Sequence, residues 1–208
     1  MNKPNLLYVD IETLPAPDHL RPVIQEQYDR QPGRSTSFED YYRGTALNAN
    51  FGQILCIGYA LNDAPAEVLE GDEPDQLKKF WKIAAQADLL IGHAILGFDL
   101  PFIIKRSVIL GIQPTKIYTL TREGAPGVFD TKKAWDIGAG PAISLDVFSK
   151  IFNLPTSKIG IDGSQVYDFF LNGRQSEITA YCARDVELTR SIYLRLTQNA
   201  QYSTNLET

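Results

Sequence analysis

The segment Leu6-Leu7-Tyr8-Val9-Asp10-Ile11-Glu12-Thr13 decides how this sequence is interpreted. Most of it consists of apolar residues of types that favour strands, which predicts a buried strand. Strand side chains alternate between two faces, so Asp10 and Glu12 should project from the same face at the strand's end. Two adjacent carboxylates repel each other unless a metal ion or a basic partner is present. The segment alone leaves two interpretations open, a strand end with two hydrated acids or part of a metal site.

Length and composition are those of an ordinary globular protein. The 208 residues are enough for one good core, so a single domain over 1–208 is expected. No apolar run reaches the length of a membrane span, and nothing before the first strand resembles a signal peptide. We therefore expect a cytoplasmic protein without membrane association. Cys56 and Cys182 both lie in apolar segments, which favours core thiols over a disulfide or a zinc site.

The net charge is −5, from 25 acidic and 20 basic residues. This balance argues against a protein that coats duplex DNA without specificity. It does not argue against an enzyme that acts on nucleic acid, because carboxylates that hold divalent cations add negative charge, which the bound ions then cancel.

The pattern of apolar residues predicts a mixed α/β layout. Further strands are expected at 52–61, 65–70, 88–92 and 128–130, a helical turn around Trp135, and helices at 72–87, 100–110, 141–153, 165–171 and 176–196. The first three strands suggest an antiparallel meander. Alternating helices and strands follow it, so helices should cover a central sheet.

A polar segment at about 15–50 interrupts this layout. It contains several prolines, shows little apolar periodicity and is too long for a simple connection. We expect either a functional flap near the site or a partly mobile segment, with a short helix that includes Phe38, Tyr41, Tyr42 and Leu47. Its aromatic side chains either stack on bases or pack onto the core, and packing is the interpretation we favour.

Two more groups of residues carry side chains suited to chemistry. Asp99 stands where a helix should begin, so it is expected to be the N-cap, but it also follows a buried strand and a glycine-containing loop. Tyr181 and Asp185 are four residues apart on the last predicted helix and share one of its faces. Taken alone, that face could be solvated, with Asp185 paired to Arg184 or Arg190.

Together, these groups resemble the three motifs of the DEDD superfamily of 3′-5′ exonucleases, in the same order along the chain. The third motif has a tyrosine four residues before its aspartate, as in the tyrosine branch (DEDDy). More closely, VDIET (9–13), GHAILGFDLPFI (92–103), SKIGIDGSQVYDFF (157–170) and YCARDVELT (181–189) resemble stand-alone exonucleases related to the proofreading domain of family B DNA polymerases. The resemblance covers nearly the whole chain and implies a ribonuclease H-like fold, a central mixed sheet flanked by helices.

The resemblance also implies a mechanism with two divalent cations, Mg²⁺ or Mn²⁺, which suit carboxylate oxygens. Asp10 would bridge both ions, Glu12 and Asp185 would hold the ion that binds the attacking water, and Asp99 would serve the second ion. Tyr181 would orient the water, because a tyrosine with an ordinary pKa near 10 is a poor base at neutral pH. The expected reaction is hydrolysis of single-stranded DNA from its 3′ end, with release of nucleoside monophosphates.

Residues next to the motifs are candidates for binding the substrate. Thr13 and Leu14 match family positions that contact the terminal nucleotide through backbone and an apolar wedge. Phe98 would stack near a base unless it only packs in the core. Lys158 would contact a backbone phosphate unless it is simply a solvated surface lysine.

One position departs from the family pattern. The second motif usually has an asparagine five residues before its aspartate, and here that residue is Ala94. The neighbouring His93 is a candidate substitute as a hydrogen-bond donor, although a histidine satisfied within its own loop is the commoner case. The departure keeps open an inactive relative that binds nucleic acid without cutting it.

Two other functions compete with the DNA exonuclease. An RNA 3′-5′ exonuclease would use the same site, because recognition of the 2′-hydroxyl depends on the shape of the pocket. A phosphatase of the haloacid dehalogenase type would also place acids after its first strand, but it leaves Tyr181 and Asp185 unexplained. Because the chain has no polymerase fingers or palm, any proofreading would need a polymerase partner in trans.

Overall fold

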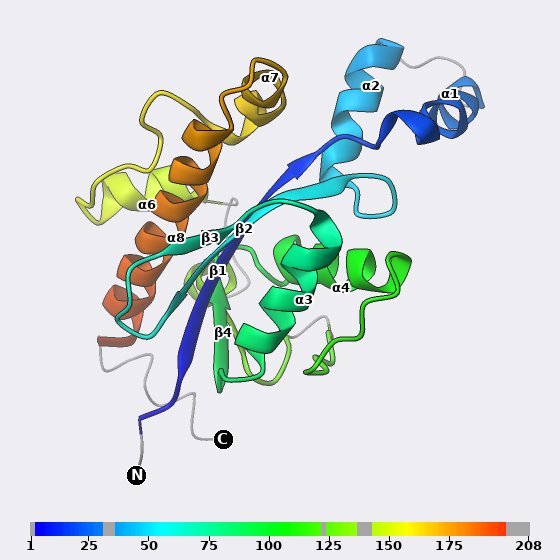
Figure 1. Ribbon diagram of the computed structural model, residues 1–208. Helices are drawn as coiled ribbons and strands as arrows, with labels where there is room; N and C mark the ends of the chain where they lie inside the picture. Colours follow the sequence, from blue (N-terminus) through cyan, green and yellow to red (C-terminus); the bar gives the residue numbers. More distant parts are fainter. Residues whose placement is uncertain (1–2, 31–35, 122–123, 137–142, 199–208) are drawn as a thin grey trace.

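Strand β1 (Leu6–Leu14) lies at the centre of a five-stranded sheet with the order β3-β2-β1-β4-β5. The computed structural model describes residues 3–30, 36–121, 124–136 and 143–198 (Figure 1). Strands β2 (Gln53–Leu61) and β3 (Glu67–Leu69) form an antiparallel meander with β1. Strands β4 (Leu89–Gly92) and β5 (Val128–Asp130) lie on the other side of β1 and run parallel to it.

Helices cover both faces of this sheet. The α-helices of the described residues are α1 (Arg21–Asp29), α2 (Phe38–Gly44), α3 (Glu73–Ala84), α4 (Asp99–Ile109), α5 (Thr131–Asp136), α6 (Leu145–Ile151), α7 (Val166–Leu171) and α8 (Gln175–Gln198). Short 3₁₀ turns occur at Asp18–Leu20, Thr45–Leu47 (η2) and Gly163–Gln165 (η3). Figure 1 shows α8 on one side of the sheet and α3 with α4 on the other.

The alternation of side chains along β1 decides what each face carries. Leu7, Val9 and Ile11 belong to the large cluster formed with α3 and α4. Tyr8 points the opposite way and meets the ring of Tyr193 on α8, with the ring centroids 5.7 Å apart. Because side chains two residues apart share a face, Asp10 follows Tyr8 toward α8.

The segment that connects β1 to β2 folds into a helical arm, α1 and α2 with the turn η2. Figure 1 shows this arm beyond the end of β1. It has a small core of its own around Ala16, Ile24 and Tyr42, all buried, and the Tyr42 hydroxyl donates to the Ala16 carbonyl oxygen at 2.5 Å. The short helix is therefore confirmed for Phe38, Tyr41 and Tyr42, but Leu47 lies in the following turn η2 and not in the helix. Helix α1 was not predicted.

Other boundaries differ in detail from the sequence-based prediction. Helix α6 begins at Leu145 because the Ser144 hydroxyl accepts a hydrogen bond from the Val147 N–H and acts as N-cap. Residues 141–142, where that helix was expected to begin, lie outside the described residues. Among the described residues, no helix is both long and apolar enough to cross a membrane.

Candidate active site

The two acids of β1 face helix α8 at a point where the helix packs very close to the sheet. Asp10 lies opposite Gly58 of β2 in the antiparallel register. A side chain at Gly58 would collide with the Cys182 sulfur of α8, because an added Cβ would lie only 2.7 Å from it. A glycine inside a strand often marks such a close approach. The absence of a side chain at Gly58 therefore lets α8 reach the acid pair.

Just after the acid pair, the pairing of β1 with β2 shifts register. Glu12 pairs with Cys56 and Thr13 with Ile54, so one residue of β2 is left unpaired between them. Such bulges bend a strand and redirect the side chains that follow. Glu12 is only 8% exposed, and Leu14, beyond the shift, packs in the same cluster as Tyr181.

Helix α8 brings the third motif to this acid pair. Tyr181 and Asp185 are each 6% exposed. Neither neighbouring arginine pairs with Asp185, because Arg184 donates to the carbonyl oxygens of the 157–159 loop and Arg190 to those of Asn62 and Ala64. The alternative of a solvated face with a surface ion pair is therefore wrong.

Asp99 reaches the same place from helix α4. Its Oδ1 accepts a hydrogen bond of 3.1 Å from the backbone N–H of Ile11, which lies between the two acids of β1. Asp99 is the first residue of α4 and Phe98 occupies the cap position, so the prediction of an Asp99 N-cap is wrong. The carboxylate thus contacts β1 as well as the backbone N–H of Asp99 itself, and the residue is 4% exposed.

The negative charges of the four carboxyl groups repel one another. Burial raises the pKa of Asp10 well above its ordinary value, and the nearby charges of Asp185, Asp99 and Glu12 raise it further. Burial also raises the pKa of Glu12. The pKa of Asp99 rises to about 7, mainly through burial, although hydrogen bonds from its own backbone N–H and from the Ile11 N–H oppose the rise. A cation among these groups would remove this penalty.

Asp185 supplies the observation that tests whether these residues suit a metal ion. Its Oδ1 is buried without a hydrogen-bond partner in the described part of the chain. Burial raises the pKa of its carboxyl group, while Ser157, Tyr181 and the positive charges of Arg184 and Lys158 oppose that rise. An unpartnered carboxylate oxygen beside three further acids fits a hard divalent cation, which prefers oxygen ligands.

The structure also places a thiol at the site, which the sequence analysis did not associate with it. The Cys182 sulfur lies 3.6 Å from Asp10 Oδ2, and ligand atoms of Asp10, Glu12 and Cys182 all lie within 4.8 Å of one another. Cys56 and Cys182 are free, buried and in one apolar cluster, so the prediction of core thiols is confirmed. The position of Gly58 in its strand was the sequence signal for the close approach of Cys182.

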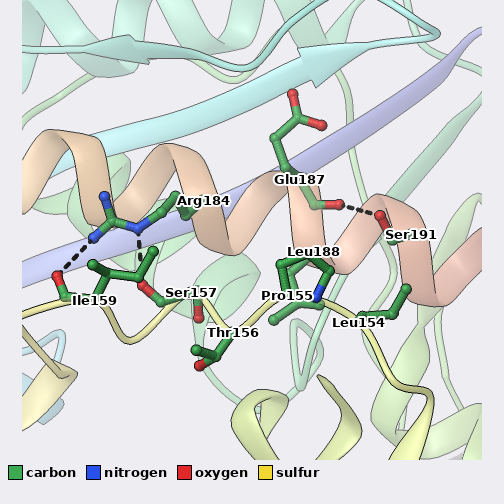
Figure 2. A pocket seen from close by; sticks show the side chains of 9 residues that line it. All are labelled: Leu154, Pro155, Thr156, Ser157, Ile159, Arg184, Glu187, Leu188 and Ser191. Atoms are coloured by element: carbon green, nitrogen blue, oxygen red, sulfur yellow. Dashed lines mark hydrogen bonds between the residues drawn. The ribbon is translucent and has the colours of Figure 1, made fainter. Parts of the chain in front are cut away.

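A loop against α8 brings Ser157 and Lys158 toward Asp185. The Arg184 Nε donates to the Ser157 carbonyl oxygen at 2.9 Å, and its Nη2 lies 3.5 Å from that of Ile159 (Figure 2). Next to these contacts the loop and α8 enclose a shallow cavity of about 190 Å³. Ser157 is 3% exposed, whereas Lys158 is solvent-exposed. Lys158 thus stands at the edge of the site with its charge available.

The loop that carries the departure from the family pattern is held by another acid. Ala94 adopts φ +57°, a left-handed conformation that favours Gly or Asn. Asp130, at the end of β5, accepts hydrogen bonds from the N–H groups of Ala94 and Leu96 at 3.0 and 3.1 Å. The loop is therefore fixed in place without the usual asparagine.

His93 is engaged in structural contacts on both sides of its ring. Nδ1 lies 3.0 Å from the Thr131 hydroxyl and Nε2 lies 3.1 Å from the Ile143 carbonyl oxygen, and the ring packs edge-on against Phe148. Burial lowers the pKa of His93 below its ordinary value. Both nitrogens are thus occupied, and we assign His93 to holding the loop.

The remaining candidates lie between the acids and the arm. The Thr13 hydroxyl donates to the Ala46 carbonyl oxygen at 2.7 Å, which ties β1 to η2. Phe98 is half-buried, and its ring centroid lies 5.5 Å from that of Phe102. Thr13, Phe98 and Glu12 line one pocket, whereas Leu14 lies in the cluster beneath Tyr181.

Comparison with known proteins agrees with this arrangement. Residues 60–207 match a family described as predicted 3′-5′ exonucleases related to the exonuclease domain of PolB. The chain belongs to this family. The region that matches the PolB-related exonuclease family includes Asp99, Tyr181 and Asp185. It begins after the arm, so it does not include the acid pair of β1. A search of curated proteins gave no match.

A solved structure supports the fold. The family B DNA polymerase from the hyperthermophilic archaeon Pyrobaculum calidifontis aligns with a TM-score of 0.65 and 17% identity, over 95% of this chain. The alignment covers 25% of that polymerase, so the chain spans about a quarter of its length. The predicted α/β fold of the PolB-related exonuclease family is therefore confirmed, with an antiparallel meander, parallel strands and flanking helices.

Proposed function

We propose that this chain is a metal-dependent 3′-5′ exonuclease that hydrolyses single-stranded DNA and releases nucleoside monophosphates. The observation that carries the proposal is the convergence of Asp10, Glu12, Asp99 and Asp185, which come from β1, α4 and α8. Burial and mutual repulsion make this arrangement costly without a cation, and Asp185 Oδ1 has no hydrogen-bond partner among the described residues. Family membership supports the same reaction.

The four acids would hold two divalent cations, Mg²⁺ or Mn²⁺. Such ions, when bound, lower the pKa of water and stabilise the charge that develops on a leaving oxygen. Tyr181 keeps its proton, because burial and the charge of Asp185 raise its pKa above the ordinary value. Its hydroxyl can therefore orient the attacking water by a hydrogen bond but cannot serve as a base. The carboxylates of Glu12 and Asp185, in contrast, act only as hydrogen-bond acceptors when they are ionised.

Side chains around the acids would hold the DNA strand. We assign the terminal nucleotide to Thr13, Leu14 and Phe98, which follow the acid pair or precede Asp99. Lys158 is exposed beside Asp185 and would contact a phosphate. A polymerase acting in trans would supply the 3′ ends if the chain proofreads.

An exonuclease assay tests the proposal. Single-stranded DNA, blunt duplex and RNA, each labelled at the 5′ end, are incubated with Mg²⁺ or Mn²⁺ and with EDTA. We expect single-stranded DNA to shorten stepwise from its 3′ end, with no reaction in EDTA, and a strand labelled at its 3′ end should release the label as a mononucleotide. Faster shortening of RNA than DNA would instead assign the site to RNA.

Two variants identify the residues responsible. Asp10→Ala and Asp185→Ala should each lower the rate at least roughly 100-fold, because even groups that only orient metal ligands contribute 10- to 100-fold. Asp75→Ala removes an exposed acid of α3 and should leave the rate unchanged. Activity in either site variant equal to that of the wild type would contradict the proposed site.

A further inference from the structure

Strand β2 carries an extra residue opposite the acid end of β1. The register shift leaves Leu55 unpaired, between the residues of β2 that pair with Glu12 and Thr13. Side chains of a regular strand alternate between two faces, yet the adjacent residues Leu55 and Cys56 both belong to the cluster that packs against α8. The bulge therefore turns two consecutive side chains of β2 toward the helix that carries the third motif.

Two side chains of helix α3 hold the backbone of this bulge. Glu73 Oε1 accepts a hydrogen bond of 2.8 Å from the N–H of Ile54. Gln76 Nε2 donates to the carbonyl oxygen of Leu55 at 2.9 Å and to that of Gly71 at 2.8 Å. A bulge disrupts the ladder locally, and buried backbone groups that stay unsatisfied are costly. Helix α3 thus supplies partners for the bulge from the side of the sheet opposite to α8 (Figure 1).

Arg106 of α4 fixes the Glu73 side chain. Its Nε donates to Glu73 Oε1 at 2.8 Å, and its Nη2 donates to Glu73 Oε2 at 2.7 Å. Only 7% of the Arg106 side chain and 10% of the Glu73 side chain are accessible. Such a bidentate pair gives the carboxylate a defined geometry. Arg106 lies seven residues after Asp99 on the same face of α4, so one helix holds Asp99 against β1 and, through Glu73, the bulge of β2.

The part of β1 that carries the acids depends on β2 for its place in the sheet. Strand β4 pairs with β1 only at residues 6–8, so among the described strands β2 alone pairs with β1 at Asp10 and Glu12. A slip of one residue in such a pairing turns side chains to the opposite face. The position of the bulge therefore decides where the Glu12 side chain points.

We propose that Glu73, Gln76 and Arg106 are positioning residues that set the direction of the Glu12 carboxylate by fixing the bulge at Leu55. This inference rests on the proposed function, in which Glu12 holds a divalent cation. The three residues act through the backbone of β2, from the face of the sheet away from the acids, and do not themselves contact cation or substrate.

This network is a costly way to stabilise a fold. Gln76 is fully buried, but its Oε1 has no hydrogen-bond partner within the described ranges. A buried ion pair such as that of Glu73 and Arg106 often contributes no more stability than apolar residues of similar volume. Buried polar groups are better known for fixing a register, because they favour one arrangement of the chain over others. The arrangement favoured here has its extra residue at Leu55.

Gln76→Met tests this role, because it keeps the approximate volume of the side chain and removes its two hydrogen bonds. Mn²⁺ binding to the DNA-free protein is measured by electron paramagnetic resonance of the free ion, together with kcat, KM and Tm. We expect the Kd for Mn²⁺ to rise roughly 10- to 100-fold, as when partners of metal ligands are removed. The kcat should fall, whereas KM for single-stranded DNA should change less. Unchanged Mn²⁺ affinity and kcat would overturn the proposal.

Ser107→Ala is the matched control for a loss of stability alone. The Trp81 Nε1 donates to the Ser107 hydroxyl at 2.8 Å, and this buried hydrogen bond also joins α3 to α4. Its loss should lower Tm and leave the Mn²⁺ affinity and kcat close to those of the wild type. Equal losses of Mn²⁺ affinity in Ser107→Ala and Gln76→Met would show a general loosening of the two helices and overturn the specific role.

Two double variants separate the ion pair from the contact with the bulge, and they keep the test decisive if Gln76→Met does not fold. Both contain Arg106→Met, so that no arginine charge is left buried without its partner. Combined with Glu73→Gln, it keeps an oxygen for the Ile54 N–H and should retain most of the Mn²⁺ affinity. Combined with Glu73→Leu, it removes that acceptor and should lose affinity. Equal affinities in the two proteins would overturn the role of Glu73.

A further variant tests whether the effect passes through Glu12. In a protein that already carries Glu12→Gln, adding Gln76→Met should weaken Mn²⁺ binding little more. Losses that add up in this double variant would overturn the route through Glu12. The proposed function is decided separately: a wild type that cleaves neither DNA nor RNA refutes the exonuclease, whereas the Mn²⁺ measurements still decide the positioning role.

Discussion

The carboxylate of Asp99 accepts a hydrogen bond of 3.1 Å from the backbone N–H of Ile11, across 88 positions of sequence. Strand β4 pairs with β1 only at residues 6–8, so beyond them the edge of β1 is open to the start of α4. Asp99 therefore joins the site to the strand that carries Asp10 and Glu12. Because its carboxylate is buried, ionised Asp99 lowers the stability of the metal-free fold.

Asp99→Asn should stabilise the metal-free protein at pH 8. The pKa of Asp99 is about 7 in the fold against an ordinary 3.8, so between these values the folded state binds more protons than the unfolded state. Stability then falls as the pH rises through that window. The amide removes this penalty, on the order of 2–4 kcal/mol, and retains an oxygen for the Ile11 N–H.

Thermal unfolding in EDTA at pH 5 and pH 8 measures this effect. The gain in Tm of Asp99→Asn over the wild type should be larger at pH 8 than at pH 5, and the variant should lose exonuclease activity. Saturating Mg²⁺ should raise the Tm of the wild type more than that of the variant. A variant less stable than the wild type at pH 8 without metal would contradict this account.

Tyr181→Phe should lower kcat roughly 10- to 100-fold, since small misplacement of a reacting group has effects of this size. The ring would remain in its apolar cluster, so stability should change little. Because Tyr181 stays protonated, the pH dependence of kcat should keep its shape. Tyr193→Phe, on the same helix but away from the acids, is the control. Loss of the alkaline or acid limb in the Tyr181→Phe profile would show that Tyr181 transfers a proton.

Arg184→Ala should shift the acid limb of the pH–rate profile to higher pH. The guanidinium group holds the loop with Ser157 and Lys158, and all three residues lower the pKa of Asp185. Without these three interactions Asp185 keeps its proton to a higher pH. Only the ionised carboxylate can bind a cation, so the activity should then appear at a higher pH. Initial rates between pH 5.5 and 9 measure the shift.

The control for this shift is Arg190→Ala, which removes an arginine of α8 that also donates to loop carbonyl oxygens, those of Asn62 and Ala64. It should leave the acid limb in place. Equal shifts in the Arg184→Ala and Arg190→Ala enzymes would point to a general effect on helix α8.

Ala94→Asn should stabilise the protein without loss of activity. A left-handed conformation costs an ordinary residue about 1–2 kcal/mol, and asparagine adopts it more readily. The free energy of unfolding should therefore rise by about 0.5–1 kcal/mol, as measured by urea denaturation. Ala94→Gly should act in the same direction, and Ala94→Val should destabilise. A stabilising effect of Ala94→Val would contradict strain at this position.

Much of the site could be predicted because it depends on local periodicity. The alternation along β1 placed Asp10 and Glu12 on one face, and the spacing of four residues placed Tyr181 and Asp185 on one face of α8. Helix α1 was not predicted, since its one buried residue, Ile24, packs with residues from outside the helix and leaves almost no periodic signal.

Contacts between distant segments could not be predicted. Local propensity made Asp99 an N-cap, but the open edge of β1 offers its carboxylate the Ile11 N–H instead. The sequence favoured a His93 satisfied within its own loop, with a contact to substrate as the alternative, but its two nitrogens are occupied by Thr131 and Ile143 from outside that loop. In each case a partner dozens of residues away competes with the local interaction, and only the folded chain decides between them.

The sequence by itself determined the order of the strands and of the helices other than α1, the shared face of Asp10 and Glu12 and that of Tyr181 and Asp185, and the family to which the chain belongs. These follow from short-range periodicity and from motifs in a fixed order. Only the tertiary structure decided that Asp185 Oδ1 is buried without a hydrogen-bond partner in the described part of the chain, that Cys182 lies against Asp10, and that the arm and α7 line a pocket beside Glu12. Burial and electrostatic repulsion depend on what the whole chain brings together, which no local pattern encodes.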